Sequence, residues 1–521
     1  MSPRSFPSCF SAVLLLLVMS LSCHAQSAAP QIRVSQGVVE GVVEDGLSVF
    51  KGIPFAAPPV GPLRWRAPQP APAWDTVRLT KDFAPSPYQP GQPRAGKSED
   101  CLYLNVWTPD ASANARLPVM VWIYGGGFSF GSTAEPVTDG ARLAKKGVVV
   151  VSIAYRVGQL GFLAHPELSA ENPEGVSGNY GLLDQIAGLE WVRNNIAAFG
   201  GDPERVTIFG ESAGGISVSM LCASPLANGL FQGAISQSGG SFGPTRPTTF
   251  PGENMRTLEQ AEAGGREYAE QAGAASLEEL RAFPADQLPL GMGFSGGWPI
   301  IDGHVIPDDQ YTMYERGDYN DVPVLIGYNS DEGLSFTRTD DPEAFRAGVR
   351  ERYGKFAGFL LEAYPLSGSG IGKTARDLNR DAAFGWHTWT WANLQARTGT
   401  GNVYLYYFDN PPPGAQGDQG SPHGQEIPFA FGTLDPDNSG LTSADRELSA
   451  TMTAYWTNFA RYGDPNGDNV PQWPSYTPEQ HRVLYLTDTP HVGPVPSESA
   501  LRVLDDYYVW RLKEGGKPWT E

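Results

Sequence analysis

Short apolar runs and stretches of helical periodicity alternate along most of the chain. The run 148–153 is typical of a central strand that is buried on both faces. Central strands are predicted over residues 102–107, 119–124, 148–153, 233–237, 322–327 and 403–408. Apolar residues recur at helical spacing over 184–198 and 444–462. This alternation predicts an α/β fold whose mostly parallel sheet is covered by helices on both faces.

Two longer segments interrupt the alternation and are predicted to be largely helical, 250–295 and 340–400. Inserted helices of this kind commonly form a roof over a site at the edge of a sheet. Nearer the N-terminus, residues 31–42 predict a short hairpin, and the proline-rich segment 50–68 is predicted to be extended and not helical. No internal repeat is visible, and we predict one domain over residues 26–521.

The sequence Gly210-Glu211-Ser212-Ala213-Gly214 follows a β-branched and aromatic run and precedes the apolar segment 216–223. A strand, a sharp turn and a helix are the context of a nucleophile elbow. The glycines on either side allow the strand and the helix to pass close to the central serine. Ser212 would then stand at the positive end of a helix, where an anionic intermediate is favoured. Because this motif also occurs by chance, the assignment depends on the rest of the chain.

An activated serine needs donors for an oxyanion, a base, and an acid that orients the base. Three glycines, 125–127, directly follow the predicted strand 119–124 and leave room for backbone N–H groups to approach a substrate. The N–H groups of Gly126, Gly127 and Ala213 are therefore the predicted oxyanion donors.

The candidate base is a histidine. His24 lies in the N-terminal segment 1–25, which is predicted below to be a cleaved signal peptide, and is therefore not considered. His423 follows the predicted strand 403–408, which is the best position for a ring delivered from the C-terminal end of a strand. The remaining histidines stand in ordinary surroundings: His165, His304, His387, His481 and His491. The acid is expected between the serine and the histidine in the chain. Asp331 and Glu332 both follow the predicted strand 322–327, and spacing alone does not separate them.

The net charge limits the kind of partner, and the N-terminal segment indicates where the protein is located. A formal net charge of −20 argues against a nucleic-acid partner, which would require a basic face.

The N-terminus predicts a signal peptide over residues 1–25, cleaved after Ala25. It has Arg4 at its start, an apolar core over 12–21 and a small-residue site before Gln26, and a periplasmic or secreted protein is therefore expected. The apolar core is too short for a stable membrane span. Cys23 would also permit a lipoprotein signal, although a serine stands three residues earlier where a leucine is usual.

Cysteines are sparse for an exported chain. Cys9 and Cys23 leave with the signal, so that only Cys101 and Cys222 remain, and the sequence does not show whether they pair. No disulfide framework is predicted, and the hydrophobic core must supply the stability.

Several motifs in this order resemble the type-B carboxylesterase/lipase family, the cholinesterase-like branch of the α/β-hydrolases. The motifs lie at 50–68, 98–106, 124–128, 179–185, 210–215, 331–333 and 423–427, and the resemblance covers nearly all of the mature chain. It implies a bacterial-type serine carboxylesterase that hydrolyses small-molecule esters through an acyl-enzyme and needs no metal or organic cofactor.

The resemblance also implies roles for individual residues. The acid becomes Glu332 rather than Asp331, so that the implied catalytic set is Ser212, His423 and Glu332. Glu211 and Ser238 are similar to the family residues that surround the histidine. The implied ion pairs are Arg156 with Asp184, and Glu99 with Arg64 or Arg66.

The chain departs from the family in the loop 82–99. Relatives usually pair the cysteine at Cys101 with one upstream, but none occurs between 26 and 100. Residues 82–99 also lack the tryptophan that binds choline in cholinesterases, since Tyr88 is the only Tyr or Trp there. Choline esters are therefore not expected as substrates.

Two alternatives stay open. One is a specialised hydrolase of the same fold, acting on a carbamate, an amide, a polyester or a polycarboxylate ester of a toxin. The other is a non-catalytic cholinesterase-like binding domain, which the intact serine, glutamate and histidine disfavour. Aromatic residues that are candidates for the pocket lining, and equally for the core, are Phe128, Phe130, Trp298, Phe384 and Trp386. The sequence leaves the natural substrate and the oligomeric state undetermined.

Overall fold

The structure is a computed structural model that describes residues 29–245, 253, 255–291, 297–337, 341–366 and 371–513. The predicted signal peptide, residues 1–25, lies outside the described residues.

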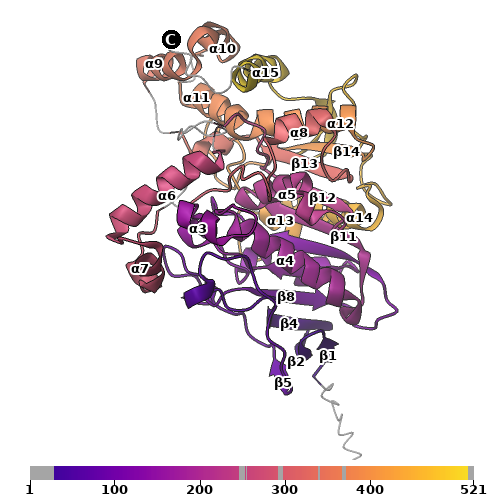
Figure 1. Cartoon of the computed structure of the whole chain (residues 1–521). Coiled ribbons are helices and arrows are strands. Elements are labelled where there is room, and N and C mark those ends of the chain that lie inside the picture. The colour runs from indigo at the N-terminus through magenta and orange to yellow at the C-terminus, as the bar shows by residue number, and fades with distance from the viewer. Residues whose placement is uncertain are drawn as a thin grey trace, which may run out of the picture.

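An eleven-stranded sheet forms the centre of the molecule (Figure 1). In spatial order its strands are β16 (His491–Pro494), β15 (Arg482–Leu486), β14 (Val403–Phe408), β13 (Val324–Asn329), β12 (Gly233–Gln237), β11 (Gly201–Glu211), β9 (Leu117–Ile123), β10 (Val149–Ile153), β8 (Tyr103–Thr108), β4 (Leu47–Pro54) and β3 (Val42–Glu44). The strands from β15 to β10 are parallel, and those beyond them at both edges pair antiparallel. The parallel strands β10, β13 and β14 are buried at every residue, as their apolar runs predict.

All six predicted central strands are present, and their ends differ from the prediction by at most two residues. The predicted hairpin is formed by β1 (Gln31–Val34) and β2 (Gly37–Glu40), which join β5 (Val77–Leu79) in a small separate sheet. The prediction that 50–68 contains no helix is wrong in one place, because Gly61–Leu63 forms a 3-10 turn. Pro62 is compatible with the start of such a turn, where its missing N–H is not needed.

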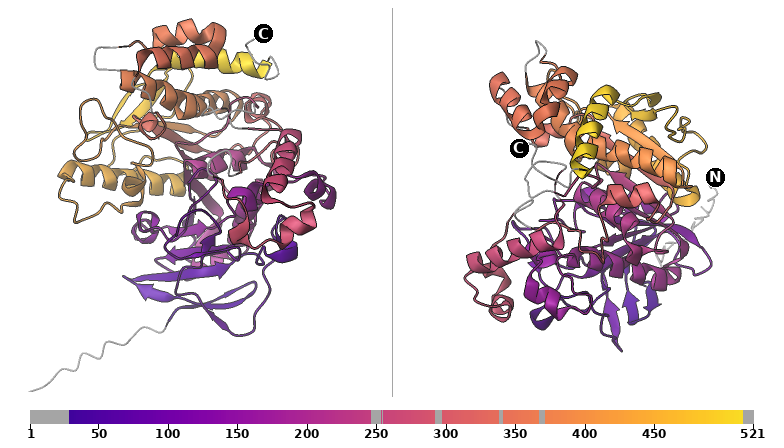
Figure 2. Two further views of the ribbon diagram at one scale, coloured as in Figure 1. Left: turned by 90° about the vertical axis from the view of Figure 1, so that its left-hand side faces the viewer. Right: turned by 45° about the horizontal axis from the view of Figure 1, so that its top comes forward.

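Helices cover both faces of the sheet. Figures 1 and 2 show α4 (Tyr180–Asn195) and α5 (Ala213–Ala223) on one face and α14 (Ser443–Tyr462) on the other. The two long predicted helices, 184–198 and 444–462, correspond to α4 and α14. Shorter helices connect the strands: α1 (Ala141–Ala144), α2 (Gly158–Phe162), α3 (Pro166–Glu171), α8 (Gln310–Arg316) and α13 (Ile427–Phe431).

Both predicted insertions are largely helical, as predicted, within the residues that the structure describes. The first contains α6 (Leu258–Ala272) and α7 (Leu277–Ala282), at the left of Figure 1. These helices share a small apolar core with the segment 160–180. The second contains α9 (Pro342–Tyr353), α10 (Ala357–Ala363), α11 (Ile371–Arg380) and α12 (Trp386–Thr398). Figure 2 shows α9 and α10 beside the C-terminal helix α15 (Glu498–Lys513) at one end of the molecule.

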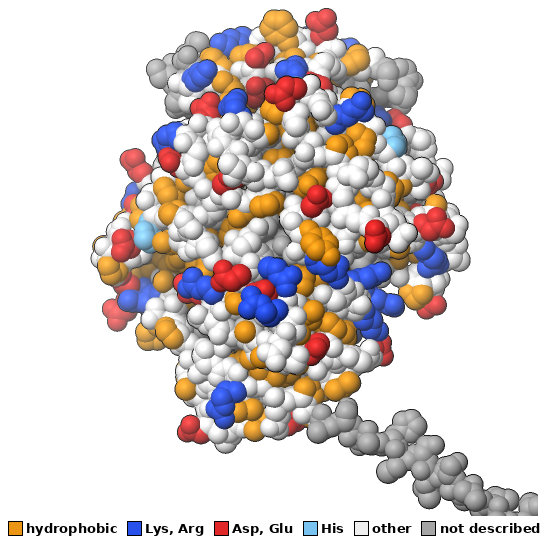
Figure 3. Space-filling view, turned by 90° about the vertical axis from the view of Figure 1, so that its right-hand side faces the viewer, with side chains coloured by type: hydrophobic (Ala, Val, Ile, Leu, Met, Phe, Trp, Pro, Cys, Tyr) orange, Lys and Arg blue, Asp and Glu red, His pale blue; other side chains and the backbone are white. Residues whose placement is uncertain are grey.

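The surface carries charges of both signs. On the face shown in Figure 3, Lys and Arg side chains form a short band across the middle, with acidic side chains within and around it. Within the described part of the chain, no helix has the length and apolar character needed to cross a membrane. The same residues contain no group of three His, Cys, Asp or Glu side chains placed to hold a metal ion.

Candidate active site

Ser212 lies in the sharp turn between β11 and α5. Its backbone has φ 55° and ψ −122°, a conformation that an L-residue adopts only under strain. The turn is possible because the residues two positions before and after Ser212 are glycines. A Cβ on Gly210 would lie 2.5 Å from the backbone of Gly214, and one on Gly214 would lie 2.0 Å from the carbonyl oxygen of Ile123. The Ser212 N–H donates to the Gln237 carbonyl at 2.9 Å. The predicted elbow is therefore present.

Three loops bring Ser212, His423 and Glu332 together. The Ser212 Oγ lies 2.8 Å from His423 Nε2, and His423 Nδ1 lies 2.5 Å from Glu332 Oε2. Glu332 follows β13 and is fully buried, and its other oxygen accepts hydrogen bonds from Ser238 Oγ at 2.5 Å and from the Asn329 N–H at 2.8 Å. This arrangement is a continuous chain of hydrogen bonds from a carboxylate through an imidazole to a hydroxyl.

The structure separates the two acids that spacing left open. The Asp331 carboxylate points away from the imidazole, and it accepts hydrogen bonds from Arg376 Nε at 2.8 Å and from the Gly420 N–H at 3.1 Å. The Asp331 N–H in turn donates to the Ser421 carbonyl at 2.9 Å. Asp331 thus connects the loop of Glu332 to the loop of His423, while Glu332 contacts the ring.

The glycine loop after β9 lies directly beside Ser212. A Cβ on Gly125 would lie 3.1 Å from the Ser212 Cβ, and one on Gly127 would meet no atom within 4 Å, so Gly127 faces open space. Gly126 and Gly127 have φ values of 109° and 58°, which favour glycine. Among the described residues, neither of their N–H groups has a hydrogen-bond partner. Ala213, the third predicted donor, is the first residue of α5.

A second carboxylate, that of Glu211, lies near the Nε2 side of the imidazole, opposite the nitrogen that Glu332 contacts. Glu211 is buried, and its Oε1 lies 3.3 Å from His423 Nε2. Burial raises the pKa of Glu211 to about 8, against the opposing effect of His423. Burial by itself would lower the pKa of His423, but the negative charges of Glu211 and then Glu332 raise it, and the net shift is upward. Of the two residues that the resemblance places around the histidine, Glu211 contacts the ring, whereas Ser238 contacts Glu332.

Glu426 is a buried carboxylate to which the sequence analysis assigned no role. It accepts hydrogen bonds from Gln237 Nε2 at 3.0 Å and from Asn329 Nδ2 at 2.5 Å, and Asn329 also contacts Glu332. Burial and then the charge of Glu332 raise the pKa of Glu426. The signal in the sequence was its position three residues after His423, but that position alone does not distinguish a buried acid from a solvated one.

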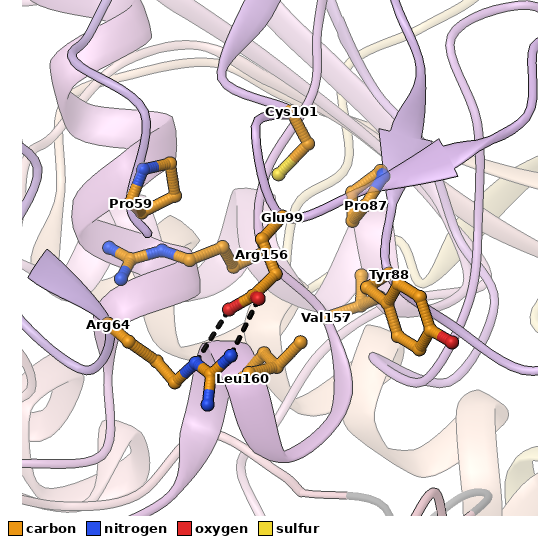
Figure 4. A pocket seen from close by; sticks show the side chains of 9 residues that line it. All are labelled: Pro59, Arg64, Pro87, Tyr88, Glu99, Cys101, Arg156, Val157 and Leu160. Atoms are coloured by element: carbon orange, nitrogen blue, oxygen red, sulfur yellow. Dashed lines mark hydrogen bonds and ion pairs between the residues drawn. The ribbon is translucent and has the colours of Figure 1, made fainter. Parts of the chain in front are cut away.

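The predicted ion pairs are present. Arg156 contacts Asp184 at 2.7 Å with both side chains buried. Glu99 pairs with Arg64 at 2.6 Å, whereas Arg66 contacts Glu171. Figure 4 shows the pair of Glu99 and Arg64 beside a small pocket that Cys101 and Tyr88 also line.

Cys101 and Cys222 are both free and buried, which resolves the open question of their pairing. Burial raises the pKa of the Cys101 thiol well above its usual value, so this thiol is protonated at neutral pH.

The aromatic residues proposed as candidates for the pocket lining lie in different surroundings. The Phe384 ring stacks on the His423 ring at 4.9 Å, and Phe128 packs against Trp298 at 4.7 Å. Of the two places left open for Trp386, the structure shows the core, because this side chain is buried against Tyr508. Phe336, which the sequence analysis did not single out, lies 5.4 Å from the His423 ring and is 45% exposed.

A cavity of about 380 Å³ lies beside the glycine loop and Glu211, the residue that precedes the serine. The glycine loop contributes Gly125, Gly126 and Phe130 to its lining, and Glu211 contributes from β11. The loop after β6 (Ser86–Pro87) contributes Gln89, Pro90, Gln92 and Pro93. A cavity of this size, next to the loop that carries the predicted oxyanion donors, can hold part of a small-molecule substrate.

Comparison with known proteins agrees with this geometry. The model of the carboxylesterase family matches residues 28–357 and 341–503. The chain is 40% identical over 489 residues to the fumonisin B1 esterase of Sphingopyxis macrogoltabida. That alignment covers 89% of this chain and 88% of that protein. It is 36% identical over 490 residues to the para-nitrobenzyl esterase of Bacillus subtilis, covering 87% of this chain and 94% of that protein.

Solved structures agree as well. A PNB esterase superimposes with a TM-score of 0.78 at 34% identity, covering 91% of this chain and 99% of that one. The carboxylesterase Est55 of Geobacillus stearothermophilus gives a TM-score of 0.78 at 33% identity with the same coverage. The chain therefore belongs to the carboxylesterase family, has the α/β-hydrolase fold and is a carboxylic ester hydrolase.

Proposed function

We propose that this esterase works through Ser212, His423 and Glu332. The observation that carries the proposal is the chain of hydrogen bonds from Glu332 through His423 to Ser212, at 2.5 and 2.8 Å. Ser212 Oγ attacks the ester carbonyl and His423 Nε2 takes its proton, while Glu332 holds the proton of Nδ1 and stabilises the imidazolium. His423 then protonates the leaving alcohol, and a water molecule repeats the sequence to release the acid from the acyl-enzyme.

The oxyanion of each tetrahedral intermediate is assigned to the N–H groups of Gly126, Gly127 and Ala213. The proximity of the glycine loop to Ser212 supports this assignment, as do the two N–H groups that lack a partner among the described residues. The turn at Ser212 exposes the nucleophile, and the N-terminus of α5 favours negative charge at the same point. Removing one donor of this kind costs about two to three orders of magnitude in rate.

A specialised substrate is the second candidate. The observation that favours it is the 40% identity to an esterase whose name gives fumonisin B1 as its substrate. Hydrolysis of p-nitrophenyl acetate, butyrate and octanoate, measured beside fumonisin B1 with the same preparation, distinguishes the two.

We expect turnover of the p-nitrophenyl series, with a preference that reports the size of the acyl site. A kcat/KM for fumonisin B1 at least about tenfold above the best p-nitrophenyl ester, or about 1.4 kcal/mol in transition-state stabilisation, would establish the specialised function. No turnover of any of these esters would contradict the proposed function.

Export is the remaining part of the proposal. Arg4, the apolar segment 12–21 and the small residues before Gln26 support a cleavable signal and a periplasmic or secreted enzyme. N-terminal sequencing of the protein recovered from periplasm and medium should begin at Gln26. A chain that keeps Met1 or Ser2 and stays in the cytoplasm would contradict export.

A further inference from the structure

The rim loop, residues 82–99, is closed without a covalent bond. Within it, β6 pairs in parallel with β7 (Lys97–Ser98), and the Cys101 thiol that follows is free. The loop also forms one wall of the 380 Å³ cavity that Gly125, Gly126 and Glu211 line. Whatever holds the rim loop in place therefore also shapes the surroundings of the nucleophile.

Gln89 makes the most direct contact between the rim loop and the glycine loop. Its side chain is buried, with 3% exposed, and its carboxamide pairs with the backbone of one residue from both sides. Oε1 accepts from the Gly131 N–H at 2.8 Å, and Nε2 donates to the Gly131 carbonyl at 2.8 Å. Nε2 also donates to the Pro87 carbonyl at 3.0 Å. The side chain thus pairs with Gly131 as a neighbouring peptide group would, and both donor hydrogens of the carboxamide are used.

Gly131 ends the turn that presents the proposed oxyanion donors. The Gly126 carbonyl accepts from the N–H groups of Ser129 and Phe130, at 3.1 and 3.2 Å. A Cβ on Gly126 would lie 2.1 Å from the Phe130 carbonyl oxygen, so the start and the end of the turn are in contact. A displacement of Gly131 therefore acts, through Phe130, on the peptide groups of Gly126 and Gly127.

The opposite end of the turn is fixed independently. Tyr124 OH donates to the Tyr155 carbonyl, and Tyr155 OH donates to the Tyr124 carbonyl, both at 2.8 Å. The two rings also stack at 4.4 Å. The Tyr124 ring lies against Gly131 as well, because a Cβ there would be 2.1 Å from a ring carbon. The turn is therefore held at its start by a tyrosine pair and at its end by Gln89.

We propose that Gln89 is a positioning residue for the oxyanion hole. Its carboxamide fixes Gly131, and through the turn 126–131 it sets the direction of the Gly126 and Gly127 N–H groups. This inference rests on the proposed function, since it takes those N–H groups as the oxyanion donors. Lys97 supports the same arrangement, because its Nζ donates to the Gln89 carbonyl at 2.8 Å and to the Gly91 carbonyl at 3.0 Å and so orders the backbone that carries Gln89.

The test replaces the carboxamide and keeps the volume, in Gln89→Met, with Gln89→Glu as the isosteric variant that places a carboxylate against the Gly131 carbonyl. Ser86→Ala is the matched control, because Ser86 Oγ joins the same rim loop to Ser132 Oγ at 2.9 Å without touching the backbone of Gly131. For each variant kcat and KM are measured on p-nitrophenyl butyrate, together with Ki for an alkyl trifluoromethyl ketone. Addition of Ser212 Oγ to the ketone carbon, with its proton passing to His423, leaves an oxyanion where the intermediate would have one.

We expect Gln89→Met and Gln89→Glu to lower kcat about 10- to 100-fold, as for a donor displaced by about 1 Å, with KM changed less than about threefold. Ki for the ketone should rise by a similar factor, and Ser86→Ala should change kcat and Ki by less than about threefold. Equal effects of Ser86→Ala and the Gln89 variants would show general loosening of the rim loop and would overturn the proposal, as would a Gln89 variant whose kcat and Ki are unchanged.

Two further readouts keep the result interpretable. If Gln89→Met fails to fold, Gln89→Glu carries the comparison, and its thermal midpoint against that of Ser86→Ala shows whether lost activity exceeds lost stability. If the wild-type enzyme itself forms no Ser212 adduct with the ketone, the proposed function fails rather than the role of Gln89. A wild type that is inhibited while the Gln89 variants bind the ketone equally well rejects only the positioning role.

Discussion

Replacing Ser212 with alanine should lower kcat/KM on p-nitrophenyl butyrate by about four to six orders of magnitude, with the fold intact. The change removes only the Oγ that lies 2.8 Å from His423 Nε2. The backbone of the turn does not depend on that atom, because the Ser212 N–H bonds to Gln237 and the flanking glycines allow the close packing. The residual rate should come from substrate binding and the oxyanion donors.

Ser219→Ala is the matched control for this measurement. Ser219 lies in α5, the helix that Ser212 precedes. Its side chain is fully buried, whereas that of Ser212 is partly exposed, and its Oγ donates to the Ile216 carbonyl at 2.9 Å. Its kcat/KM should stay within about threefold of the wild type, which places it among substitutions away from the chemistry. A Ser212→Ala protein that is free of contaminating esterase and retains more than about 1% of the wild-type kcat/KM would exclude a serine nucleophile at this position.

The strands of this fold could be predicted because a parallel sheet buries both faces of each strand, which leaves a continuous apolar run in the sequence. β12 and β14 agree with the prediction to the residue. The elbow could be predicted because its geometry excludes side chains, and a pair of glycines around one serine records that exclusion. In both cases a local physical requirement restricts the residue types at fixed positions.

The parts that could not be predicted depend on contacts between distant segments. Gln89 is an ordinary loop residue in the sequence, and its role follows only from a partner 42 positions away. Phe336 and Glu426 reach the surroundings of the imidazole through the positions of their loops, which no local pattern specifies. Trp386 is a candidate for the pocket by its sequence position but lies in the core. An aromatic residue in a helical insertion can pack in the core as readily as it lines a pocket.

The choice between Asp331 and Glu332 belongs to the same class. Both acids follow β13 and both are buried, so neither spacing nor hydrophobic pattern separates them. The distinction is made by direction: one carboxylate meets the imidazole, and the other meets Arg376 and the backbone of the histidine loop. Substituting each acid by its amide should therefore give two different phenotypes.

Glu332→Gln should lower kcat/KM by about four orders of magnitude with little loss of stability. The amide keeps the size of the side chain and can still accept from Ser238 Oγ and from the Asn329 N–H. It no longer holds the Nδ1 proton or stabilises the imidazolium, so the ring adopts the tautomer that cannot take the serine proton. The pH profile adds a signature. Because Glu332 helps to raise the pKa of His423, which acts as a base only when neutral, the acid limb of kcat/KM should move to lower pH in the variant.

Asp331→Asn should instead lower stability more than activity. It weakens the contact with Arg376 and lowers the free energy of unfolding by about 1–3 kcal/mol, while kcat/KM falls by about tenfold or less. The measurements are kcat/KM from about pH 5 to 9 and urea unfolding near neutral pH for both variants and the wild type. If Asp331→Asn lost the four orders of magnitude and Glu332→Gln only the stability, the orienting acid would be Asp331. Equal losses of activity in both would mean that the two loops act on His423 as one unit, with no single acid responsible for its tautomer.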